Sequence, residues 1–253
     1  MALAPGAVPG PPTRSPAPGR RQSTLGGNRD MAIQIETKDC TALTDADLGE
    51  MADASTSAGA GFEVGQLSKA KEDWVLAGTA RLDGKLHGFS FATLERIGGT
   101  PCVLIGLATI KRTSKRDAVL KAVMAEAYHR ALMAFPDEDV LVGTRFVSAS
   151  GFEAFRALTD IVPRPGHKAV GEERAWGRRL AKRFGVDGTY DEQTFRVTGD
   201  GSLASHFDHE SLKPEAVDPA ITAMFTGINP AAGDCLIAFG WAMAEDLLKL
   251  GSH

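Results

Sequence analysis

Residues 101–132 read PCVLIGLATI-KRTSKR-DAVLKAVMAEAYHRAL, and their pattern gives the clearest indication of the fold. Its first ten residues are almost wholly apolar, which is typical of a strand covered on both faces. From Asp117 the apolar side chains recur at steps of three and four residues, which predicts a long helix ending at Pro136. A buried strand therefore runs through a short basic turn directly into a helix.

Around this junction the pattern predicts shorter elements. They are, in chain order, a strand at 32–36, a helix beginning at Thr44, strands at 74–80 and 85–96, and, after the long helix, a strand at 139–147 and a short helix at 148–158. Asp83-Gly84 and Gly98-Gly99 are hairpin signals, while the long helix makes one right-handed parallel crossover. The expected fold is α/β (α+β), with a mixed, mostly antiparallel sheet flanked by helices.

The two ends of the chain differ in composition from this centre. Residues 1–30 are rich in Pro, Gly and Arg, and we expect a disordered tail there. Residues 166–253 are expected to contain a basic helix at 172–184, a weak strand at 194–197 and two helices split by Asn229-Pro230, the second covering Cys235–Leu250. The predicted organisation is a tail at 1–30, a domain at 31–165, and a C-terminal extension at 166–253 that packs on the core or forms a dimer arm.

Composition limits the classes of protein. The 253 residues are 43% hydrophobic and 24% charged with a formal net charge of -4, which is ordinary for a soluble globular protein and gives no reason to expect nucleic acid as a partner. No window of about 18 uncharged apolar residues predicts a membrane span. Cys40, Cys102 and Cys235 are far apart and fit neither a disulfide framework nor a zinc site, so we expect a reducing, cytoplasmic location.

The basic turn is the strongest candidate for a ligand site. Lys111, Arg112, Lys115 and Arg116 place four cations within six residues, just before the helix. The first turn of a helix also offers unpaired N–H groups and a partial positive charge, which together bind phosphate. This arrangement suits a pyrophosphate better than a single carboxylate. The alternative is a solvated basic loop.

This strand, turn and helix resemble the GCN5-related N-acetyltransferase (GNAT) superfamily, which transfers acyl groups from acyl-coenzyme A to amines. In that family a central strand is splayed from its neighbour, the gap holds the pantetheine, and a loop of the form Gln/Arg-x-x-Gly-x-Gly/Ala wraps the pyrophosphate. Residues 111–118 match this loop, with Ser114 and Arg116 in place of its two glycines. Residues 148–155 match a later Asn-x-x-Ala-x-x-Phe-Tyr motif, with Ser148 for Asn and Phe155 for Tyr.

The resemblance covers about residues 31–165 and implies a function. It implies an N-acyltransferase that moves an acetyl or short acyl group from acetyl-CoA, or another acyl-CoA, to a small-molecule or protein amine by direct attack, without a metal. The acyl-CoA contacts that it implies are Thr109, Ile110, Lys111, Arg112, Ser114, Lys115, Arg116, Asp117, Ser148, Phe152 and Phe155. The family's Tyr commonly protonates the departing thiolate, which Phe155 cannot do. The alternative is a non-catalytic acyl-CoA-binding or protein-interaction module on the same scaffold.

Other candidate residues are weaker. Glu95, at the end of the second central strand, is the candidate general base, and its alternative is a solvated turn residue. His206, Asp208 and His209 carry metal-ligand chemistry but lack a second cluster, so we expect an exposed polar loop. The apolar run from Leu236 to Leu248 leaves room for a homodimer interface, with packing on its own domain as the alternative.

Overall fold

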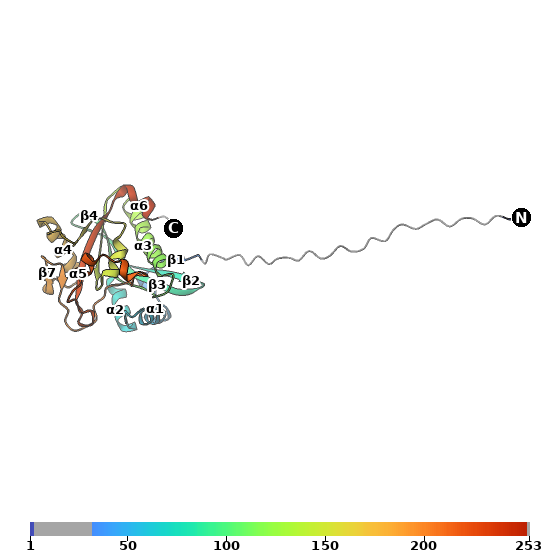
Figure 1. Cartoon of the computed structure of the whole chain (residues 1–253), viewed down its shortest axis with the longest axis horizontal. Coiled ribbons are helices and arrows are strands. Elements are labelled where there is room, and N and C mark those ends of the chain that lie inside the picture. The colour runs from blue at the N-terminus through green and yellow to red at the C-terminus, as the bar shows by residue number, and fades with distance from the viewer. Residues whose placement is uncertain (3–31, 252–253) are drawn as a thin grey trace. The chain divides into compact units, whose positions relative to one another are not determined.

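The computed structural model describes residues 1–2 and 32–251, so the predicted tail at 1–30 falls almost entirely outside the described residues. In the described region the strands join into one sheet with helices on both faces (Figure 1). Helices α3 and α6 pack together on one face, and α1 and α2 pack together on the other.

The helices and strands have the following bounds. The strands are β1 Gln34–Asp39, β2 Leu76–Leu82, β3 Lys85–Ile97, β4 Thr100–Ile110, β5 Val140–Phe146, β6 Thr159–Val162, β7 Tyr190–Asp191, β8 Arg196–Val197, β9 Phe207–Asp208 and β10 Cys235–Ala242. The α-helices are α1 Asp45–Ala58, α2 Val64–Asp73, α3 Arg116–Ala134, α4 Gly171–Arg183, α5 Pro219–Met224 and α6 Ala244–Leu250. A 3-10 segment, η2, covers Ala149–Phe155.

The sheet is mixed and mostly antiparallel, which confirms the predicted fold class. Its order is β1-β2-β3-β4-β9-β5-β10-β8-β7, with β6 also paired to β10. Neighbours from β1 to β4 are antiparallel, β4 and β5 are parallel, and β10 is antiparallel to β5. Residues 166–253 therefore add four strands, β7 to β10, to the sheet that residues 31–165 begin.

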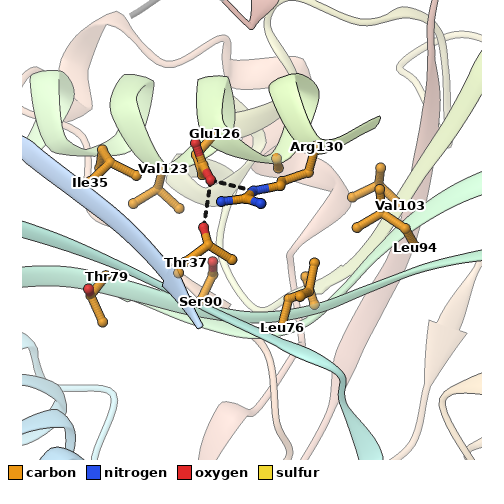
Figure 2. A pocket seen from close by; sticks show the side chains of 13 residues that line it. Ile35, Thr37, Leu76, Thr79, Ser90, Leu94, Val103, Val123, Glu126 and Arg130 are labelled. Carbon is orange, nitrogen blue, oxygen red and sulfur yellow. Dashed lines mark hydrogen bonds and ion pairs between the residues drawn. The ribbon is translucent and has the colours of Figure 1, made fainter. Parts of the chain in front are cut away.

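Helix α3 covers the first half of the sheet, as the period of its apolar residues predicts. Its own residues Val119 and Tyr128 are buried. At the outer edge Glu126 accepts hydrogen bonds from the Thr37 hydroxyl at 2.6 Å and from Arg130 Nε at 2.7 Å, which ties the helix to β1 (Figure 2). The middle of α3 is thus held against the edge strand of the sheet.

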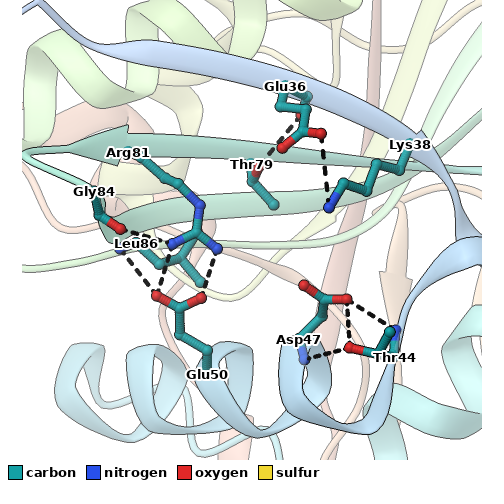
Figure 3. A network of polar contacts seen from close by, with 9 residues as sticks. All are labelled: Glu36, Lys38, Thr44, Asp47, Glu50, Thr79, Arg81, Gly84 and Leu86. Atoms are coloured by element: carbon teal, nitrogen blue, oxygen red, sulfur yellow. Dashed lines mark hydrogen bonds and ion pairs between the residues drawn. The ribbon is translucent and has the colours of Figure 1, made fainter.

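Helix α1 begins at the predicted N-cap. Thr44 accepts from the Asp47 N–H, and the Asp47 carboxylate accepts from the Thr44 N–H at 2.9 Å, so the pKa of Asp47 is lowered. One turn later Glu50 accepts two hydrogen bonds from Arg81, which lowers the pKa of Glu50 and fixes α1 to β2 (Figure 3). These polar contacts orient the helix from which the chain enters α2.

The predicted helix at Cys235–Leu250 is wrong for its first half. Residues 235–242 form β10, in the interior of the sheet, and only the last seven residues are helical. Cys235 to Phe239 are buried without a break, which is the pattern of a strand covered on both faces and not of an amphipathic helix. This part of the apolar run lies inside the core and offers no dimer surface, while a homodimer stays a prediction.

The expected helix at 148–158 is also shorter than predicted. Its residues form the 3-10 segment η2, and β6 follows at Thr159. In the part of the chain that the structure describes, no helix has both the length and the apolar character needed to cross a membrane.

Gly106 on β4 allows a close contact that a test can break. A Cβ at this position would lie 1.8 Å from Trp74 Cε2, and Trp74 is itself buried. We expect Gly106→Ala to lower the free energy of unfolding by about 1–3 kcal/mol, because the indole must move. Chemical denaturation measures the change. As a control, Gly49→Ala in α1 meets open space and is expected to raise stability by about 0.5–1 kcal/mol.

Candidate functional site

The candidate site begins where β4 and β5 part. These parallel strands pair from Cys102–Leu141 to Ile105–Thr144. Beyond that point β9 lies between them, with Phe207 opposite both Ala108 of β4 and Phe146 of β5. The chain's own backbone therefore fills the gap. We call residues 205–211 the inserted segment.

The inserted segment is well buried. The Ala108 N–H donates to the His206 carbonyl at 3.1 Å. The Phe207 side chain is fully buried, with its ring centroid 5.8 Å from that of Phe146. Burying a Phe side chain contributes about 1.5–3 kcal/mol, so this residue anchors the segment.

Two of the four predicted cations meet an anion on this segment. Arg112 Nε lies 3.0 Å from Glu210 Oε2, and Arg116 Nη2 lies 3.5 Å from Glu210 Oε1. Arg116 Nη2 also donates to the Ser211 carbonyl at 2.7 Å. The start of α3 thus already holds a carboxylate, through the two guanidinium groups.

The other predicted contact residues near the basic turn differ in their exposure. Lys111 is half-buried and its N–H donates to the His87 carbonyl at 2.8 Å. Ser114 and Lys115 are exposed, and Asp117 is exposed in the first turn of α3. Their roles in acyl-CoA binding stay predictions.

The last two residues of β4 are covered on both faces of the sheet. Thr109 and Ile110 are fully buried, and the Thr109 hydroxyl has no hydrogen-bond partner among the described residues. The backbone of Thr109 lies opposite Asp208 of β9, which is the side of β4 that the resemblance assigns to the donor.

The matched motif at 148–155 builds an aromatic cluster. Phe152 and Phe155 lie with their ring centroids 5.1 Å and 5.0 Å from that of Phe146, and Phe155 is fully buried. Ser148 is the residue that precedes η2. Phe155 therefore occupies a core position, and its ring supplies packing where a Tyr would supply a proton donor.

Glu153, which the sequence analysis did not single out, connects η2 to the inserted segment. It accepts from His209 Nε2 and from the Ser211 hydroxyl, both at 2.9 Å. Asp117, Glu153 and His209 each offer one potential metal-ligand atom, and these three atoms lie within 4.8 Å of one another. The expectation of an exposed polar loop at 206–209 is wrong, because Phe207 draws its polar neighbours into the sheet with it.

Glu95 lies apart from the cations. It is opposite Cys102, about 23 Å along β4 from Thr109. Its carboxylate accepts a hydrogen bond from Arg183 Nε at 2.9 Å, and both side chains are half-buried. The alternative of a solvated turn residue is wrong, since Glu95 is paired; a role as general base stays a prediction.

Two features could not be found from motifs. The inserted segment contributes only two ladder residues, from far along the chain. Arg145 is a charged residue at the end of an otherwise apolar strand, and it is only 6% exposed. Its one sequence signal is that it interrupts the apolar run DVLVGTRFV.

Among known proteins, the similarities found are to solved structures. No protein family matches the sequence, and no curated protein matches it. Similar solved structures include the ribosomal-protein-S18-alanine N-acetyltransferase of Escherichia coli (10% identity, 55% of this chain and 86% of that chain, TM-score 0.39). They also include an acetyltransferase of the GNAT family from Streptococcus pneumoniae (10%, 55% and 92%, 0.37) and aminoglycoside N-acetyltransferase AAC(6')-Iy in complex with CoA (13%, 62% and 90%, 0.35).

These matches are likenesses of fold at low identity. They cover little more than half of this chain, and their TM-scores are below 0.4. What this chain does is therefore argued from its own residues.

Burial shifts the ionisation of the inserted segment. It raises the pKa of Asp208 to about 6, although Arg112 lies 3.8 Å away and acts in the opposite sense. It lowers the pKa of His206 to about 4 and also lowers the pKa of His209. Burial thus disfavours the charged forms of all three side chains.

Asp208→Asn tests this burial. Since the pKa of Asp208 is higher in the folded chain than its ordinary value, the stability it contributes falls as pH rises from about 4 to about 6. Asn keeps the shape without the charge. We expect the variant to match the parent near pH 4 and to exceed its free energy of unfolding by roughly 2 kcal/mol at pH 7.

Chemical denaturation at both pH values measures the difference, with Asp53→Asn on the exposed face of α1 as the control. The comparison cancels the opposite pH dependence of His206 and His209. Lower stability of Asp208→Asn at pH 7 would mean that the contact with Arg112 outweighs the burial of the charge.

Proposed function

We propose that this chain transfers an acyl group from acyl-CoA to an amine, and that the donor binds in place of the inserted segment. The observation that supports it is the carboxylate of Glu210 held by Arg112 and Arg116 at the start of α3. A pair of guanidinium groups that binds one carboxylate also suits a pyrophosphate, which offers more oxygens and more charge.

The inserted segment and the proposed donor, acyl-CoA, share an extended arm that ends in an anion. An extended arm runs along β4, and an anion at its end meets the cations beside the first turn of α3. From Ser205 to Glu210 an extended chain spans at most about 17 Å, similar to a pantetheine arm. Pantetheine also carries amide groups, which can take over the hydrogen bonds that β9 makes to β4.

The donor and the segment then compete for one gap. A ligand that binds only the open state has its apparent affinity reduced by the fraction of molecules that are open. The segment loses the burial of Phe207 and the ion pairs of Glu210 when it leaves. Binding of acyl-CoA is therefore expected to be weaker than the gap alone would allow.

The chemistry follows from the backbone at the point of separation. Ile105 and Leu107 pair with Ala92 and Phe91, so Gly106 lies in a bulge without a partner in that register. Its N–H is the donor we assign to polarise the thioester carbonyl. The amine attacks that carbon, loses its proton to water or to Glu95, and the C–S bond breaks. CoA leaves as a thiolate and takes its proton from solvent, because Phe155 has none to give.

Titration of acetyl-CoA into the full chain tests the site. We expect binding, and we expect Glu210→Gln to tighten it about three- to tenfold, because the variant removes the anion that competes for the two guanidinium groups. Glu215→Gln, outside the inserted segment, is the control and should leave binding unchanged. Pantetheine, which lacks the pyrophosphate, should bind much more weakly than CoA.

Turnover is tested with a thiol reagent and a panel of amines. Release of CoA that requires both an amine and the protein supports transfer. Binding of acetyl-CoA without release would favour a non-catalytic acyl-CoA module. If neither the parent nor Glu210→Gln binds acetyl-CoA at millimolar concentration, the proposed function is wrong.

A further inference from the structure

A cavity opens where β4 and β5 part, on the face of the sheet that carries α2. Its volume is about 330 Å³, and the residues that matter here are Lys69, Asp73, Trp74, Arg145, Arg183 and Ser205. We call it the Arg145 cavity. It lies between the ends of α2 and α4 and the first residue of the inserted segment.

Arg145 is a buried cation with incomplete partners. Its Nη2 donates to the Gly106 carbonyl at 3.0 Å, and its guanidinium lies 4.8 Å from the centre of the Phe184 ring. Its Nε has no hydrogen-bond partner among the described residues, and none of their carboxylates lies within 4.0 Å of it. Burial lowers the pKa of Arg145, although the charge of Asp73 acts in the opposite sense from beyond ion-pair distance. Buried charges are normally paired, so an anion bound beside Arg145 would supply the partner that its guanidinium lacks.

The rest of the lining has the same charge preference. Lys69 adds a second cation at the mouth, and Arg183 is already paired with Glu95. Asp73 is the acid among the cavity's lining residues, and it is exposed. Trp74 supplies an apolar wall. The cavity therefore suits a small organic anion with an apolar part, and the flat guanidinium matches a carboxylate.

The cavity meets the end of the donor path that is opposite to the cations. Ser205 lines it, while Glu210, at the other end of the inserted segment, contacts Arg112 and Arg116. Gln66 of α2 donates to the Leu203 carbonyl at 3.1 Å, which holds the approach to this segment beside the cavity. A donor that binds in place of the segment, with its pyrophosphate at Arg112, would present its acyl group here.

We propose that the Arg145 cavity binds the carboxylate of the acceptor, so that the substrate is a small amine that also carries a carboxylate. The role as acceptor site rests on the proposed function. The binding of a carboxylate does not, since it depends only on residues that are already in place.

Calorimetric titration of the full chain with matched acids and amides tests the proposal without acyl-CoA. The probes are phenylalanine against phenylalaninamide, and phenylacetate against phenylacetamide, with inorganic phosphate as a second anion. We expect the two acids to bind and the amides to bind at least about tenfold more weakly.

Variants assign the binding to the cavity. Arg145→Met is expected to weaken the acids about thirtyfold or more, and Lys69→Ala, at an exposed position that leaves the fold intact, about threefold. Lys121→Ala on α3 is the control and should have no effect. Equal binding of acids and amides, binding of phosphate alone, or acid binding that Lys69→Ala and Arg145→Met leave unchanged would overturn the proposal.

The two proposals fail in different ways. Loss of acetyl-CoA binding with intact, Arg145-dependent acid binding would remove the acceptor role and the proposed function, and would leave the anion site. Transfer of acyl groups to the amines of phenylalanine and phenylalaninamide at equal kcat/KM would remove the carboxylate specificity and leave the proposed function.

Discussion

The separation of β4 from β5 leaves backbone groups on both strands without partners in each other. Two parallel strands joined through α3 pair over four residues, and beyond Ile105 and Thr144 each presents backbone groups to the gap. Buried N–H and C=O groups must find partners, so the gap needs an occupant with an extended, hydrogen-bonding backbone. In this chain β9 is that occupant. The position of β9 in turn places Glu210, two residues further along the chain, beside Arg112 and Arg116.

The proposed function requires the C-terminal extension to release β9 without leaving the sheet. β10 pairs with β5 over seven residues, from Leu236–Phe146 to Ala242–Val140, and its core side chains are buried. β9 contributes two residues to the ladder, within a stretch without other regular strands between β8 and α5. The extension is therefore anchored by a long central strand, and the inserted segment is a short excursion from it. Opening the gap would then cost the contacts of the inserted segment and leave the pairing of β10 with β5 in place.

The sequence predicted the elements whose pattern is local. The apolar run at 101–110, the helical period after Asp117 and the Thr44 cap each depend on neighbours along the chain, and each is where the pattern places it. Cys235–Ala242 was assigned to a helix because a short, fully apolar run carries no period, and only the central position in the sheet settles the matter. The positions of the inserted segment and of Arg145 could not be predicted for a different reason. They are determined by contacts between residues far apart in the sequence, such as Phe207 with Phe146 and Arg145 with Gly106.

The departures from the GNAT loop motif change how an anion is held. Glycines at positions 114 and 116 would let a ligand approach the backbone closely, and side chains there keep it further away. Arg116 replaces one of them and reaches outward to Glu210 and to the Ser211 carbonyl. Arg112 holds the same carboxylate from the other side of the turn. In this chain, charge from two side chains holds the anion, whereas close backbone N–H groups would hold it in a loop of the GNAT form. Because the Arg112 and Glu210 side chains are each about 40% exposed, such a site is weaker at high salt than a backbone cradle would be, for the internal carboxylate and for a phosphate alike.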